Sequence, residues 1–243
     1  MGSEPNPAER LAVSVAAVVT APAVAVVGAL PAEIRPRLRG WLHAATIPIA
    51  LLGAIVLWRS AAPGGYARSA LVFGIAMIGL YAGSSLYHVV PWGSRMRFVM
   101  GRIDQMMIQI MIAGTFTPIA FHTLSGQWRV WSLVVAWLVA LVGSGIAWSP
   151  IQAPRWVAFA GFIGFGWLAV IPFARIITAL PWEGTGLIVL GGLLYTIGAV
   201  VWVRQRPNPI PEWFGFHEVF HLLVIAATTA HYLAIWRYVL PIA

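Results

Sequence analysis

Seven nearly uncharged apolar runs, each long enough to cross a lipid bilayer, constrain what this chain can fold into more than any other feature. A transmembrane helix needs about 20 apolar residues to span the hydrocarbon core. The expected spans are 40–58, 69–90, 103–121, 129–148, 156–174, 184–203 and 216–238. Turn-forming stretches separate them, such as AAPGG at 61–65 and RQRPNPIPE at 204–212. The sequence therefore predicts an all-α integral membrane protein, built as a seven-transmembrane helix bundle.

The composition agrees with a polytopic membrane protein and excludes some chemistry. Hydrophobic residues make up 60% of the chain and charged residues only 9%, whereas a soluble domain carries about 25% charged residues. Because the chain has no cysteine, disulfides and cysteine-ligated metals are excluded. Many of the 13 tryptophans fall near the expected span ends, where an aromatic belt is expected. The small residues of GFIGFG at 161–166 are expected to pack helices closely.

The positive charge of the chain predicts topology. All 15 basic residues are arginine and lie scattered in short loops, which does not match the clustered patch of a nucleic-acid-binding protein. If the first of the seven spans starts inside, the inner segments hold nine arginines and the outer ones five. The inner set is Arg35, Arg37, Arg39, Arg95, Arg97, Arg102, Arg155, Arg204 and Arg206, and the outer set is Arg59, Arg68, Arg129, Arg175 and Arg237. The bias predicts a multi-pass protein of the cell (plasma) membrane with its first core span starting in the cytoplasm and its C-terminus outside.

The N-terminal region is treated separately, as a leader over residues 1–37 ahead of a transmembrane domain over 38–243. It contains an uncharged stretch of alanine and valine at 11–30, interrupted by Pro22. A signal peptide is not expected, because Glu4 and Glu9 precede this stretch in place of a positive cluster. The residues leave open whether 11–30 forms an extra N-terminal span or lies on the membrane surface.

Ionisable residues inside spans mark functional sites by default, because burying them in lipid is expensive. Ser84 and His88 lie four apart at the end of the second span, Asp104 lies at the start of the third, and His217 and His221 open the seventh. With the predicted topology, all five lie at one depth near the cytoplasmic side. Three histidines and a water form a catalytic zinc site with an open position.

Other polar residues have simpler interpretations. His43, His122 and His231 are expected to form hydrogen bonds between helices. The stretch HEVFH at 217–221 matches a zinc-protease pattern in which the glutamate is the general base. Glu218 is expected instead to make a capping or loop contact near the start of its helix.

Several of these stretches together resemble the hemolysin III family, the bacterial branch of the progestin and adipoQ receptor group that includes the adiponectin receptors. The resemblance covers roughly residues 38 to 240. Its marks are Ser84 and His88, Asp104 sixteen residues on, AGTFTP at 113–118, FGFHEVFH at 214–221 followed by His231, and RGWLH at 39–43. One departure is Gln105, where hemolysin III proteins often have a histidine.

The resemblance implies a seven-helix bundle with a cytoplasmic N-terminus and, in its metal-bearing members, a Zn²⁺ ion. The implied ligands are His88, His217 and His221, with Asp104 and Ser84 beside the metal. Gln105 leaves this ligand set intact but is expected to alter hydrogen bonding near Asp104.

The leading hypothesis is a zinc-dependent hydrolase of amides or esters in membrane lipids, similar to the ceramidase-like lipid-amide hydrolases of the same superfamily. The metal would lower the pKa of its bound water and polarise the carbonyl, Asp104 would accept the proton or orient the water, and Ser84 would bond the water or the oxyanion. The alternatives are a receptor or sensor with a structural zinc, a membrane-perturbing hemolysin, and an intramembrane zinc protease. A membrane lipid is the expected substrate or ligand; the sequence does not fix the oligomeric state.

Overall fold

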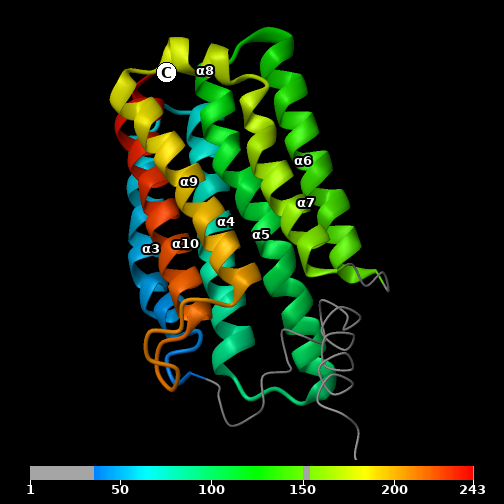
Figure 1. The fold of residues 1–243 in the computed structure, drawn as a ribbon. Helices are drawn as coiled ribbons and strands as arrows, with labels where there is room; N and C mark the ends of the chain where they lie inside the picture. The colour runs from blue at the N-terminus through cyan, green and yellow to red at the C-terminus, as the bar shows by residue number, and fades with distance from the viewer. Residues whose placement is uncertain (1–35, 150–153, 243) are drawn as a thin grey trace, which may run out of the picture.

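The structure is a bundle of long helices that run side by side (Figure 1). It is a computed structural model and describes residues 36–149 and 154–242. The leader stretch 11–30 therefore lies outside the described residues. The helices are α3 (Trp41–Ser60), α4 (Gly65–Val89), α5 (Ser94–Thr123), α6 (Gly126–Trp148), α7 (Arg155–Trp167), α8 (Phe173–Ala179), α9 (Trp182–Arg204) and α10 (Phe216–Ala234). Short turns extend two of them: η2 (Leu168–Val170) follows α7, and η3 (Ile235–Val239) and η4 (Leu240–Ile242) follow α10.

The helices have the length and composition of membrane spans. Among the described residues, 6 helices are long and apolar enough to cross a membrane, and the bent pair formed by α7 and α8 makes up to 7. The all-α membrane bundle predicted from the sequence is confirmed.

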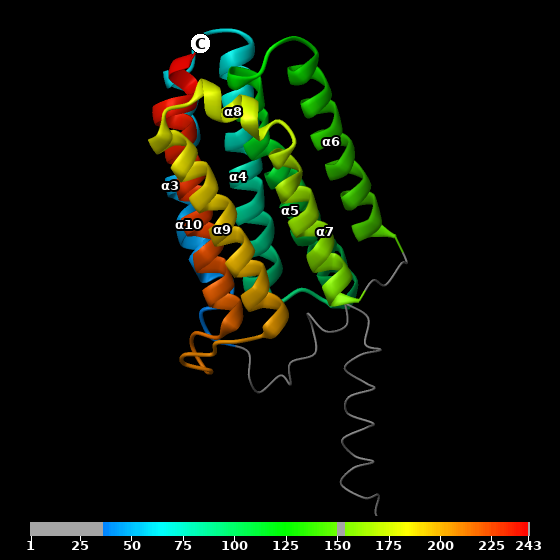
Figure 2. The same ribbon diagram turned by 45° about the horizontal axis from the view of Figure 1, so that its top comes forward.

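The single span expected over 156–174 is bent in the structure. The helical segment Trp156–Val170 ends before Phe173, and α8, which follows, is turned by 53° relative to this segment. Pro172 lies in the break. Proline lacks a backbone N–H, so one hydrogen bond of the helical ladder is missing at this point. As a result, α8 lies at the end of the bundle that also holds the C-terminus (Figure 2).

The core lies along α4 and α5. In these two helices 61% and 56% of the most apolar window is buried, against 17% in α6 and in α9. The core contains large side chains of α4, α5 and α10, among them Phe73, Leu80, Met111 and Val224. The outer helices instead expose apolar side chains over much of their surface, which suits a lipid environment.

Small residues bring the central helices close together. A Cβ atom added at Gly74 would collide with Ala54 of α3, and one added at Gly114 of α5 would collide with Ala76 of α4. The prediction that GFIGFG packs closely against another helix was wrong. A Cβ added at Gly161, Gly164 or Gly166 would meet open space. Close packing through glycine occurs where α3, α4 and α5 meet, and α7 uses none of these three glycines for it.

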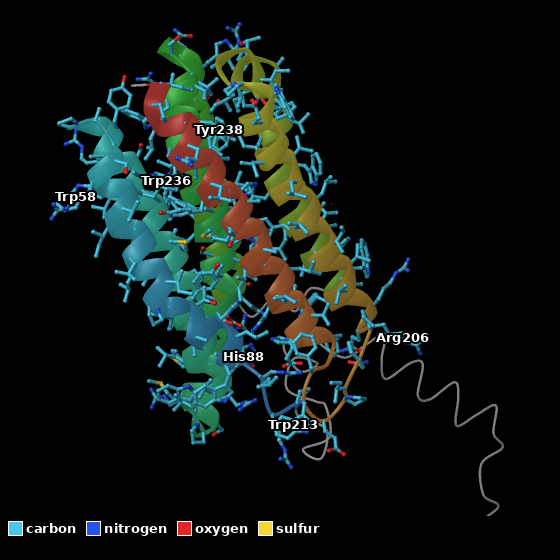
Figure 3. The ribbon with its side chains drawn as sticks, turned by 90° about the vertical axis from the view of Figure 1, so that its left-hand side faces the viewer. Trp58, His88, Arg206, Trp213, Trp236 and Tyr238 are labelled. Carbon is cyan, nitrogen blue, oxygen red and sulfur yellow. The ribbon has the colours of Figure 1, made fainter. Side chains whose placement is uncertain are left out.

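Four elements meet at one end of the bundle, which we call the histidine end. Helix α4 ends there, and α3, α5 and α10 begin there. Figure 3 shows His88 toward this end, with Trp213 and Arg206 beyond it, while Trp58 and Trp236 lie toward the other end. Trp58 and Trp213 are both exposed, so aromatic side chains flank the bundle at both ends, as expected for membrane interfaces.

Candidate metal centre

Two helices bring three histidines together at the histidine end. His88 lies in the last turn of α4, His217 is the second residue of α10, and His221 lies one turn further along α10. All three are buried. Residues four apart on a helix share a face, so His217 and His221 both point toward the end of α4.

The geometry of the three rings fits a metal ion. Each ring offers one nitrogen, and these nitrogens all lie within 4.8 Å of one another. The Nε2 atoms of His88 and His217 are 3.1 Å apart. With zinc–nitrogen bonds of about 2.0–2.1 Å, two ligands of a tetrahedral zinc lie about 3.3 Å apart. The His88–His217 pair is therefore already close to the spacing that a bound zinc requires, and the His221 nitrogen lies within 4.8 Å of both.

Asp104 of α5 lies beside this cluster. Its Oδ2 atom is 3.5 Å from Nε2 of His88, and its side chain is 21% exposed. This ring nitrogen is the one that also faces His217. The carboxylate therefore lies on the side of His88 where a metal would sit, and its side chain is less buried than those of the three histidines.

Ser84 lies on α4 one turn before His88 and is buried. The four-residue spacing puts its hydroxyl on the same face of the helix as the His88 ring. Of the predicted site residues, the structure brings His88, His217, His221 and Asp104 into direct proximity, and it puts Ser84 next to them along α4.

Glu218 is fully engaged in contacts that hold the start of α10. One carboxylate oxygen accepts a hydrogen bond from the backbone N–H of Gly215 at 2.9 Å. The other accepts one from Nε of Arg39 at 2.9 Å, in a buried ion pair. The expected capping contact is confirmed. A buried carboxylate has to be paired and hydrogen-bonded. Because both oxygens of Glu218 are engaged in this way, it is poorly placed to act as the base of a protease.

The remaining histidines behave differently from one another. His231 makes the expected bond between helices, because its Nε2 lies 3.0 Å from the carbonyl oxygen of Ile188 on α9. The rings of His43 and His122 make no hydrogen bond of such regular geometry to the described residues, but both interact with backbone groups of other helices: His43 with His221, and His122 with Val239 and Tyr66. His122 packs against the ring of Tyr66.

His43 is the residue whose position sequence reasoning missed. Its ring stacks on that of His221, with centroids 3.9 Å apart and planes only 6° from parallel. One signal was available: His43 begins the first span at the same end where His217 and His221 begin the last. The contact itself depends on how α3 packs against α10, which the sequence does not show.

Comparisons with known proteins agree with this fold and cluster. A family described as "Haemolysin-III related" matches residues 32–232, a range that includes all three clustered histidines and Asp104. The chain is 28% identical over 169 residues to the "Hemolysin-3 homolog" of Bacillus subtilis (strain 168), which covers 69% of this chain and 75% of that protein.

Animal proteins are similar as well. The chain is 25% identical over 212 residues to the human "Monocyte to macrophage differentiation factor", covering 82% of both chains. It is 27% identical over 182 residues to the "Adiponectin receptor protein" of Drosophila melanogaster, covering 67% of this chain and 41% of that one. The family match extends over most of the described bundle. The chain therefore belongs to the haemolysin-III related family, within the wider group that includes the adiponectin receptors.

Proposed function

We propose that this protein is a zinc-dependent hydrolase that cleaves amides or esters of membrane lipids. The observation that carries the proposal is the buried cluster of His88, His217 and His221 with the Asp104 carboxylate beside it. A purely structural histidine cluster would not need a partly exposed carboxylate on the metal side of one ligand.

Zinc is the metal that the donor set favours. Three imidazole nitrogens and no thiolate are typical of catalytic zinc sites, which leave a fourth position open. When bound, the ion would polarise the substrate carbonyl and lower the pKa of its bound water to about 7.

Asp104 is proposed as the general base. Its Oδ2 lies 3.5 Å from Nε2 of His88, one of the three clustered histidines, and its side chain is partly exposed. As water adds to the carbonyl carbon, Asp104 takes its proton and then returns it to the departing nitrogen or oxygen while the C–N or C–O bond breaks. The products are a fatty acid and an amine or an alcohol. Ser84 is proposed to donate a hydrogen bond to the oxygen that becomes negative in this step.

A lipid substrate suits the surroundings of the site. The three histidines are buried at the ends of helices that expose apolar side chains on their outer surfaces. A substrate with a hydrocarbon chain can lie among such helices while its head group stays near the membrane surface. We propose the plasma membrane as the location, with the histidine end facing the cytoplasm. Seven described arginines lie in or next to the helix segments at that end: Arg37, Arg39, Arg95, Arg97, Arg102, Arg204 and Arg206.

The test compares wild type with Asp104→Asn in the detergent-purified protein, measuring zinc content and fatty-acid release from ceramide-like and acyl-ester lipids. As a general base, Asp104 contributes on the order of 10²–10⁴ in rate, so the variant should keep its zinc and lose nearly all turnover. If Asp104 instead only held the ligands in position, its replacement would weaken metal binding about 10–100-fold. Hydrolysis that survives in Asp104→Asn would sink the proposed mechanism.

A receptor or sensor with a structural zinc is the second candidate. One fact that favours it is that the three ligands tie α4 to α10, so a bound metal would lock the bundle even without catalysis. Another is that one relative carries the name "Adiponectin receptor protein". A wild-type protein that holds zinc tightly but releases no fatty acid from any lipid of the panel would favour this function over the hydrolase.

A further inference from the structure

The start of α3 contacts the metal-binding segment of α10 at two points. Arg39 pairs with Glu218 through a 2.9 Å contact between Nε and Oε1. Four residues later, the ring of His43 stacks on the ring of His221. Both contacts are buried, and both fall within the turn of α10 that runs from His217 to His221.

The same segment also touches the other helix that supplies a ligand. Gly40 has a positive φ of 85°, and a Cβ added there would come within 2.6 Å of Cβ of His88. The Ser85 hydroxyl donates a 3.3 Å hydrogen bond to the Gly40 carbonyl oxygen. Only glycine combines this backbone conformation with so close an approach to a neighbouring helix. The residue before α3 therefore packs directly against α4 beside His88.

We propose that His43 is a positioning residue of the metal site, which fixes the plane of the His221 ring. The inference rests on the proposed zinc at His88, His217 and His221. An imidazole binds a metal through a lone pair that lies in the ring plane. A neighbour stacked on the ring face therefore restricts rotation of the ring without blocking its nitrogens.

His43 is itself held in place, as this role requires. Tyr81 of α4 packs against it with ring centroids 5.0 Å apart, and both side chains are buried. A ring that is already oriented loses less freedom when it binds a metal, so the affinity of the site rises. This explains why a histidine so near the cluster stacks on a ligand and is not itself one of the three clustered ligands.

The experiment measures zinc affinity by chelator competition in the full-length purified protein, together with the visible spectrum of the Co²⁺ form. His43→Leu removes the flat ring, and an aromatic contact of this kind corresponds to about threefold to tenfold in affinity. We expect zinc binding to weaken by that factor and the Co²⁺ spectrum to shift. His43→Phe, which restores a flat ring without nitrogens, should bind zinc within about twofold of wild type.

The matched control is His122→Leu. His122 is also buried and packs on an aromatic ring, but it lies near the end of α5, at the other end of the bundle. It should leave zinc affinity unchanged even if the melting temperature falls. If His43→Leu does not keep a wild-type melting profile, His43→Met fills the same space flexibly and gives the same test.

Three results would overturn the proposal. If His43→Leu binds zinc like wild type while His221→Ala loses it, the stack has no role and the metal site still stands. If His43→Phe loses zinc completely, His43 is a ligand and not a positioning residue. A wild-type protein that binds no zinc overturns both this inference and the proposed function.

Discussion

His217 and Glu218 are adjacent in the sequence but serve different parts of the molecule. Successive helical residues point about 100° apart, so His217 faces His88 while Glu218 faces Arg39 and the backbone of Gly215. The capping contact could be predicted because it is local, with a glutamate three residues after the residue it caps. The Arg39 pair joins residues 179 positions apart and requires the folded bundle. The His43 stack could not be predicted for the same reason.

Removing a ligand should separate the clustered histidines from the others. His217→Ala takes away one of three nitrogens that lie within 4.8 Å of one another, so we expect zinc content to fall from about one per chain to near zero. His231→Ala is the control, since His231 bonds to Ile188 and lies outside the cluster. Elemental analysis of the purified proteins measures both, and full occupancy in His217→Ala would exclude the proposed site.

The Arg39–Glu218 pair should matter for stability and not for metal binding. Glu218→Gln keeps an oxygen to cap Gly215 but leaves the buried Arg39 charge without its partner. We expect a loss of roughly 3–5 kcal/mol in unfolding free energy, because a buried charge is left unpaired, measured by thermal or denaturant unfolding in detergent, with zinc content unchanged.

The double variant Arg39→Gln with Glu218→Gln is the matched control for this pair. It removes both charges and should recover part of the stability lost in the single variant, because no unpaired charge stays buried. A large loss of zinc or of hydrolysis in Glu218→Gln, with normal stability, would instead revive the protease-like role of this glutamate.

At the scale of the helices, hydropathy located most spans within a few residues and failed where helices extend beyond the apolar run. The third span was expected to start at residue 103, but α5 starts at Ser94. Arg95 and Arg97 favour a loop because they are charged. A helix can, however, continue past the membrane surface into water, and α5 includes both residues. The Pro172 break has a local signal in the sequence, but the 53° turn of α8 depends on how the segments pack.

The glycines give a test at this scale. Gly114→Ala places a Cβ against Ala76 of α4, a contact that only a backbone shift can relieve. Such overpacking costs about 1–3 kcal/mol, so the melting temperature should fall. Gly164→Ala on α7 meets open space and should leave it unchanged or slightly higher, since alanine favours helices by about 1 kcal/mol over glycine. Equal effects at both positions would contradict the packing of α4 against α5.

The whole molecule is arranged so that the clustered side chains come from helices that end or begin at one end. His88 lies at the end of α4 and His217 at the start of α10, while Asp104 lies about three turns into α5. The common depth of these residues could be predicted by counting spans from a fixed side. Their mutual contact could not be predicted, because it requires α4, α5 and α10 to be neighbours. Hydropathy does not determine the order of helices around a bundle. The α3 start completes this end through Gly40 and His43.

The same arrangement leads to a prediction about topology. The start of α3 lies at the histidine end, and the C-terminus lies at the opposite end, beside α8 (Figures 1 and 2). Arginines flanking the predicted spans number nine on the side where the first span starts and five on the other. Because arginine-rich loops stay in the cytoplasm, a reporter between Trp92 and Gly93, ahead of α5, should read as cytoplasmic and one after Ala243 as external.

A further reporter tests whether the bent pair crosses the membrane. If α7 and α8 together form one span, a reporter in the turn between Ala179 and Trp182 must be external. If they form a re-entrant segment, it must read as cytoplasmic, on the same side as the start of α7. We expect the external result, because α7 begins near the end of α6 and α8 lies at the end holding the C-terminus (Figure 1). If the C-terminal reporter reads as cytoplasmic and the one at residue 92 as external, the bundle has the opposite orientation. The lipids that reach the histidines would then have to come from the outer leaflet.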